Sequence, residues 1–166
     1  MTDSNERCSK IIDYFAESCE RMNDFQRTLD RTNQFRQVTS GSNIRKYLDG
    51  WKLEKWIEAE LNPLEGLWAC WWLELGFENG QWLVHTNVSI SHSDTELDLT
   101  HSKVDTPDAL RHCLNTALNE LEIALDKNSA FRAAVDAALA RSAKSTFSKL
   151  WCHIRGPHRK AHRAGR

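Results

Sequence analysis

Three side chains in the middle of the chain, Glu74, His85 and Asp98, are of the types that carry acid–base chemistry. Asn79-Gly80, the preferred pair for a two-residue hairpin turn, would place Glu74 directly opposite His85 and Asp98 diagonal to it. A carboxylate beside an imidazole fixes one tautomer and stabilises the protonated ring, as a general acid or base requires. No nucleophile joins the group, because Cys70 falls several residues from His85 in that pairing. Catalysis is therefore the third-ranked hypothesis, and we expect a protein that is not an enzyme.

Residues that could bind a metal or a cofactor form no known pattern. The five cysteines are odd in number and scattered, without the spacing of a zinc knuckle or the pairing of a disulfide framework. His112 and Cys113 are neighbours on a predicted helix and point in different directions, while His153, His158 and His162 belong to a basic tail. The seven glycines build no phosphate-binding loop. We predict no metal and no cofactor.

The stretch from Leu67 to Val88, LWACWWLELGFENGQWLVHTNV, contains four of the seven tryptophans within fifteen residues. A turn at Asn79-Gly80 fixes how its two halves pair. The residues then set opposite each other are Phe77 and Trp82, Leu75 and Val84, Leu73 and Thr86, Trp71 and Val88, and Ala69 and Ile90. One face is almost wholly apolar, and a slip of one residue would destroy it. Trp71 and Trp82 therefore belong to a core.

Alternation with a period of two extends this hairpin in both directions. The run WKLEKWIEAEL (51–61) precedes a five-residue turn, NPLEG, that pairs Leu61 with Leu67, Ile57 with Trp71 and Leu53 with Leu75. On the other side, a loop at 91–94 puts Val88 beside Leu97 and Thr86 beside Leu99. The sequence thus predicts a four-stranded antiparallel meander with strands near 51–61, 67–77, 81–90 and 95–100.

The opposite face of this sheet gathers tryptophans, carboxylates and one histidine. Its rows include Trp56 with Trp72, and Glu54 with Glu74, His85 and Thr100. Such a face can be merely solvated, or a helix can cover it. It can also bind a partner, because tryptophan is common at interface hot spots and carboxylates attract cations. The candidate partner-binding residues are Trp56, Trp68, Trp72, Glu54, Glu74, His85, Asn87 and Asp98.

Helices are predicted on both sides of the strands in the sequence. An N-terminal apolar stripe is formed by Cys8, Ile12, Phe15, Cys19, Met22 and Leu29, and Ile11 and Phe25 widen it on its flank. This helix needs the domain's own sheet or another copy as its partner, and TSGSN (39–43) ends or interrupts it. Thr106 is an N-cap candidate before Pro107, and this helix buries Leu110, Leu114, Ala117, Leu118, Leu121 and Leu125. A further helix carries Phe131, Ala134, Val135, Ala138 and Leu139.

These elements predict a single α+β domain. Residues 1–155 form the domain, with an N-terminal helix region at 1–40, the meander at 44–101 and two helices at 106–155 that pack on the sheet. Residues 156–166 form a flexible basic tail. A homodimer through the N-terminal helix stays open. The polar start of the chain and its lack of long apolar runs favour the cytoplasm and exclude a membrane span.

The charge of the chain is divided along its length. No acidic residue follows Asp136, and the eight lysines and arginines beyond it leave the preceding part at −9 within a net charge of −1. A basic arm can bind phosphates, so a protein associated with nucleic acid or the ribosome is the second-ranked hypothesis. Its binding residues would be Lys149, Arg155, Arg159, Lys160, Arg163 and Arg166.

The first-ranked hypothesis is a non-enzymatic cytoplasmic binding module, of the adaptor, chaperone or immunity type. It rests on an ordinary core, the lack of a catalytic set, and one unusual surface. The acidic, tryptophan-bearing sheet face would bind another protein through that protein's basic surface or segment.

Overall fold

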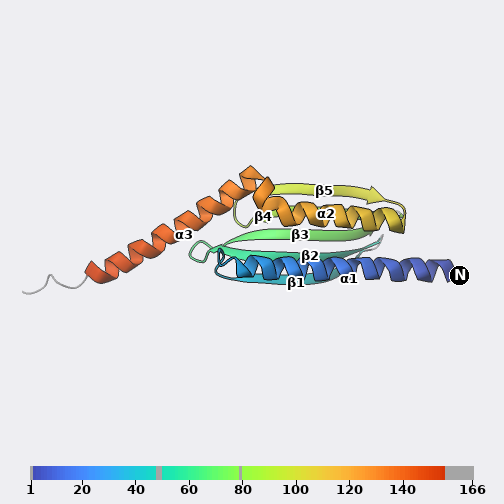
Figure 1. Cartoon of the computed structure of the whole chain (residues 1–166), viewed down its shortest axis with the longest axis horizontal. Helices are drawn as coiled ribbons and strands as arrows, with labels where there is room; N and C mark the ends of the chain where they lie inside the picture. Colours follow the sequence, from blue (N-terminus) through green and yellow to red (C-terminus); the bar gives the residue numbers. More distant parts are fainter. Residues whose placement is uncertain (1, 48–49, 79, 156–166) are drawn as a thin grey trace, which may run out of the picture.

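The computed structural model describes the backbone of residues 2–47, 50–78 and 80–155, with side chains for 10–46, 50–77 and 80–144. The elements follow the order helix, five strands, two helices, as Figure 1 shows. Their bounds are α1 Thr2–Arg31, β1 Val38–Tyr47, β2 Gly50–Asn62, β3 Leu67–Glu78, β4 Gln81–Ile90, β5 Glu96–Val104, α2 Pro107–Lys127 and α3 Ser129–Arg155. The α+β class and the antiparallel sheet are confirmed.

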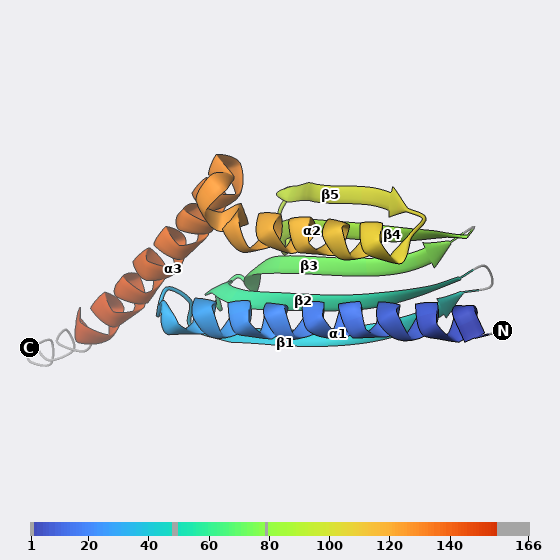
Figure 2. The same cartoon turned by 45° about the vertical axis from the view of Figure 1, so that its right-hand side comes forward.

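The five strands form one antiparallel meander in the order β1-β2-β3-β4-β5. The predicted central hairpin is confirmed, because Leu75 faces Val84, Trp71 faces Val88 and Glu78 faces Gln81. Gly80 has a φ of +80°, which a glycine adopts without steric cost. Both α1 and α2 lie on one side of the sheet, α1 over β1 and β2 and α2 over β4 and β5 (Figures 1 and 2). The molecule therefore has two layers, with its core between the helices and one sheet face.

The predicted count of four strands is wrong, because the segment TSGSN belongs to an additional strand. Strand β1 pairs along its whole length with β2, from Val38 opposite Ala59 to Tyr47 opposite Gly50. The helix before it ends at Arg31, so TSGSN neither ends nor interrupts that helix. As an edge strand, β1 has few apolar side chains, so the alternation that marks the other strands is weak in its sequence.

Two irregularities shift the predicted pairing at the sheet's ends. Leu67 pairs with Asn62 rather than Leu61, because the Asn62 side chain accepts a hydrogen bond from the backbone of Leu64 (3.1 Å) and closes a tight turn. In β5, Val88 faces Leu97 as predicted, but Thr86 faces Thr100, since a bulge lies between them. The bulge turns Thr100 toward α2, where its hydroxyl donates to Glu120 at 2.5 Å.

The core centres on Trp71, whose side chain is fully buried. Phe25 of α1 and Phe131 of α3 meet its ring edge to face, with centroids 5.9 and 5.6 Å away. The buried stripe of α1 runs through Ile11, Met22 and Leu29, whereas Ile12 is 65% exposed. Met22 and Leu29 of the predicted stripe are therefore buried, as is Ile11 from its predicted flank, and only the placement of Ile12 is wrong. The helix packs on this domain's own sheet.

The C-terminal helices agree closely with the prediction from the sequence. Thr106 caps α2 by accepting a hydrogen bond from the backbone of Ala109 at 3.3 Å, and every residue of its predicted apolar face is buried. Helix α3 packs through Phe131, Val135 and Ala138 against the end of the core. Beyond that contact, α3 projects away from the sheet (Figures 1 and 2). The predicted basic tail, 156–166, lies outside the described residues.

Candidate functional site on the uncovered sheet face

The sheet face opposite α1 and α2 carries no helix among the described residues (Figure 2). We call it the open face. Its rows across the sheet, read from one end of the strands to the other, are Glu60 and Trp68; Thr39, Glu58, Cys70, Ser89 and Glu96; Gly41, Trp56, Trp72, Asn87 and Asp98; Asn43, Glu54, Glu74, His85 and His101; and Arg45, Lys52, Gly76, Leu83 and Lys103. All eight candidate partner-binding residues belong to this one surface.

A stacked pair of indoles forms the centre of the open face. The rings of Trp56 and Trp72 lie 5.2 Å apart between centroids and are inclined by only 13°. Gly41 of β1 makes room for this pair, because a Cβ atom there would lie 2.6 Å from Trp56 Cε2 and closer still to Cζ2. Both tryptophans remain half-buried without any helix above them. We call this stacked pair, which a glycine accommodates, the aromatic platform.

Three of the six described carboxylates on the open face are already paired with a lysine or arginine of the chain. Glu54 is 4% exposed, forms an ion pair with Arg45 (3.1 Å) and accepts a hydrogen bond from Asn43 (3.4 Å). Glu74 lies 2.9 Å from Lys52, and Glu60 lies 3.8 Å from Arg36. Two of these cations come from β1 or the segment before it, which the sequence did not place beside the acids. The open face is therefore less acidic than its carboxylate count indicated.

Glu58, Glu96 and Asp98 keep an acidic character at one end of the open face. None of them has a lysine or arginine within ion-pair distance among the described side chains, and Asp98 pairs instead with His85, 2.9 Å from Nε2 to Oδ1. Arg45, Lys52 and Lys103 lie at the opposite end. The open face thus has an acidic end and an aromatic centre. At the opposite end, Lys103 adds to two cations, Arg45 and Lys52, that already pair with Glu54 and Glu74.

The predicted acid–base group is only partly assembled. Glu74 and His85 are cross-strand partners, but Glu74 reaches Lys52 and His85 reaches Asp98. The residue facing His85 on β5 is His101, with ring centroids 5.3 Å apart, and not Thr100 as predicted, because of the bulge. Burial, with the Glu58 carboxylate second, raises the pKa of the Cys70 thiol to about 11. A thiol held protonated in this way is a poor nucleophile at neutral pH.

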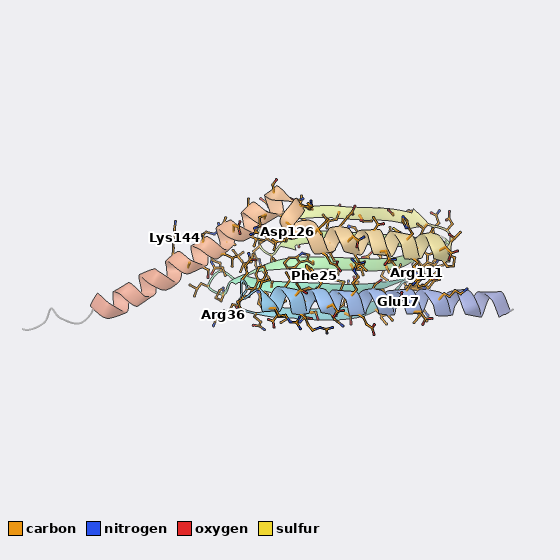
Figure 3. All side chains as sticks on the ribbon, in the orientation of Figure 1. Glu17, Phe25, Arg36, Arg111, Asp126 and Lys144 are labelled. Carbon is orange, nitrogen blue, oxygen red and sulfur yellow. The ribbon has the colours of Figure 1, made fainter. Side chains whose placement is uncertain are left out.

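Other parts of the molecule offer less for recognition. A cleft of about 230 Å³ lies between α1 and α2, yet its arginines are occupied. Arg21 binds Glu122 at 2.6 and 2.7 Å, and Arg111 lies 3.6 Å from Glu17 across the helix pair (Figure 3). Over the ranges with described side chains, no three His, Cys, Asp or Glu residues gather as metal ligands. No helix in the described part of the chain is long and apolar enough to cross a membrane.

The residues proposed for nucleic-acid binding have no described side chains. Lys149 and Arg155 lie on the projecting end of α3, and Arg159, Lys160, Arg163 and Arg166 lie outside the described residues. Sequence reasoning also missed residues that shape the open face. These are Gly41, Arg45, Lys52, His101 and Lys103. The first two lie on β1, whose weak alternation gave no clear strand signal.

Comparison of the chain with protein families, with curated proteins and with solved structures finds no match.

Proposed function

We propose that this chain is a non-enzymatic binding module that holds another polypeptide on its open face. The observation that carries the proposal is the stacked Trp56–Trp72 pair on a face that no described helix covers. Rigid aromatic side chains at the centre of a surface are typical of interface hot spots, because they bury a large area at little entropic cost. In this reading the protein acts in the cytoplasm as an adaptor, chaperone or immunity protein.

The charge layout defines the chemistry of the partner. Glu58 and Glu96 lie in the row next to the tryptophan pair, and Asp98 lies in the same row as the pair. A partner that presents lysine or arginine there gains charge complementarity and a cation–π contact with an indole face. The paired acids, Glu54 and Glu74, contribute less attraction than the sequence indicated, because Arg45 and Lys52 already neutralise them.

Affinity capture with the immobilised protein tests this proposal. Trp72→Ala removes half of the platform, and Ile12→Ala removes an exposed apolar side chain from α1 as the matched control. We expect a partner that the wild-type and Ile12→Ala proteins recover and that Trp72→Ala does not. Raising the salt concentration to about 0.5 M should weaken the capture, since exposed charges are screened. Equal recovery with Trp72→Ala would remove the open face from the function.

The runner-up, binding of nucleic acid through the basic arm, rests on the sequence after Asp136. With eight lysines and arginines and no acidic residue, this arm is the largest excess of positive charge in the chain. Retardation of single-stranded RNA or DNA at low salt by the full chain, and weaker retardation by a chain ending at Arg155, is the expected result. No retardation at low ionic strength would eliminate this second function.

A further inference from the structure

On two strands of the open face, an acid at one end is matched by a lysine at the other end. Strand β2 carries Glu58 on one side of the tryptophan pair and Lys52 on the other. Strand β5 repeats the arrangement with Glu96 and Lys103. The line that separates the two halves runs across the strands, between the row of Trp72 and the row of Glu74. Reflecting positions across this line exchanges Glu58 with Lys52 and Glu96 with Lys103. It also sets the tryptophan pair opposite Glu54 and Glu74, whose carboxylates are already paired with Arg45 and Lys52.

Such a pattern is self-complementary under a two-fold rotation. Consider a second copy turned by 180° about that line and laid face to face on the first. Each strand then lies over the same strand of the second copy with its direction reversed. Glu58 meets Lys52 of the second copy, Glu96 meets Lys103, and Asp98 meets His101. A two-fold axis parallel to the strands would instead place the lysine end of one copy over the lysine end of the other, and the like charges would repel.

The area of the open face fits a stable pair of chains. Five strands spaced about 4.8 Å apart, each about ten residues long at about 3.3 Å per residue, cover roughly 800 Å². A standard interface buries about 800 Å² on each partner. Sheets stack face to face about 10 Å apart, crossing at about 30°, with side chains interleaved. The tryptophan pair would lie at the centre of this contact and the charges nearer its rim.

We propose that a second copy of this chain binds the open face, paired about a two-fold axis that runs across the strands. The inference rests on the proposed function, because it takes the open face to be an interaction surface and names one partner for it. The basic segment that the acidic end requires is the lysine end of the other copy. Self-association then keeps the face closed until another partner displaces the second copy.

Charge reversal at Glu96 and Lys103 tests this pairing directly. Both side chains are exposed, so neither change should unfold the protein. Within one copy the two residues stand seven positions apart on the same strand, roughly 23 Å, which is too far for direct contact. An interaction between them can therefore form only between copies.

We expect sedimentation equilibrium to show a wild-type dimer with a dissociation constant on the order of micromolar. Glu96→Lys and Lys103→Glu should each weaken it by about tenfold or more, because every change places two like-charged pairs in a two-fold interface. Mixing the two variants should restore association, since both pairs in the mixed dimer are then opposite in sign. The double variant Glu96→Lys/Lys103→Glu should also dimerise. Glu20→Lys, an exposed change on α1, is the control and should leave the dimer intact.

Two outcomes would overturn the inference. A wild-type chain that stays monomeric at about 100-fold above the expected dissociation constant has no self-complementary face. A dimer that is insensitive to both single reversals, or that mixing fails to restore, uses another surface. Neither outcome touches the capture of a different protein through Trp72, so the proposed function is judged separately. Conversely, a face-to-face dimer without Trp72-dependent capture supports self-association and contradicts the binding of another protein.

Discussion

Trp71 and Trp72 are consecutive residues of β3, and the sheet gives them opposite environments. Trp71 points toward the helices and is fully buried among Phe25, Phe35 and Phe131. Trp72 points to the open face, is half-buried, and stacks on Trp56. The helix-covered face is a buried hydrophobic core, whereas the open face carries an aromatic platform with charged side chains around it. Residue type alone does not distinguish the two roles.

The largest effect should come from truncating the covered tryptophan. Trp71→Ala removes a ring that three phenylalanines contact, so it should lower the free energy of unfolding by about 3–5 kcal/mol. The same change at Trp72 loses chiefly the stack, worth about 0.5–1.5 kcal/mol. Urea denaturation of both variants measures the difference. Equal, large losses would mean that the open face is a second core, and the comparison would fail.

A smaller effect should come from filling the space beneath the platform. Gly41→Ala places a Cβ atom against the Trp56 ring, so the ring must shift and the stack must open, at a cost of about 1–3 kcal/mol. Urea denaturation gives the cost, and near-ultraviolet circular dichroism reports the altered indole pair.

The matched control for this change removes the ring that the new methyl group would meet. In a Trp56→Ala background, Gly41→Ala should be neutral or slightly stabilising, because alanine restricts the unfolded chain more than glycine does. A cost that persists in that background would show that the strand backbone, and not the indole, requires glycine at this position.

Much of the fold could be predicted from the sequence where burial imposes a strict period. The hairpin register from Ala69 to Ile90 and the buried face of α2 follow from alternating or helical spacing of large apolar residues. Strand β1 was not predicted, because it is an edge strand rich in serine, glycine and asparagine, residues that are typical of loops. The bulge beside Leu99 was not predicted either. Both Leu99 and Thr100 fit the face that packs toward α2, so the sequence does not show which of them faces Thr86.

The candidate site was predicted in its membership but not in its charge balance. Alternation alone places Trp56, Trp72 and Glu74 on one face, so their association followed from the register. The partners of the acids depend on which strand lies at the edge. Without β1, the Glu54 carboxylate had no visible cation, and Arg45 supplies it. Long-range pairing of charges is decided by strand order, which local sequence patterns do not encode.

The smallest effect concerns the one thiol of the open face and tests how dry that face is. Burial first, and the Glu58 carboxylate second, raise the pKa of Cys70 from 9.0 to about 11. At pH 8 the native thiolate should therefore be roughly 100-fold scarcer than in the unfolded chain, and alkylation by iodoacetamide correspondingly slower. Because the folded-state pKa is the higher one, the associated stability is fully present below pH 9 and is lost as the pH rises toward 11.

Mass spectrometry of the Cys70 peptide measures the alkylation rate as a function of pH, with the urea-unfolded chain as the reference. A native rate that levels off near pH 9 would mean that water reaches Cys70 freely, and that the open face is more solvated than its half-buried tryptophans indicate.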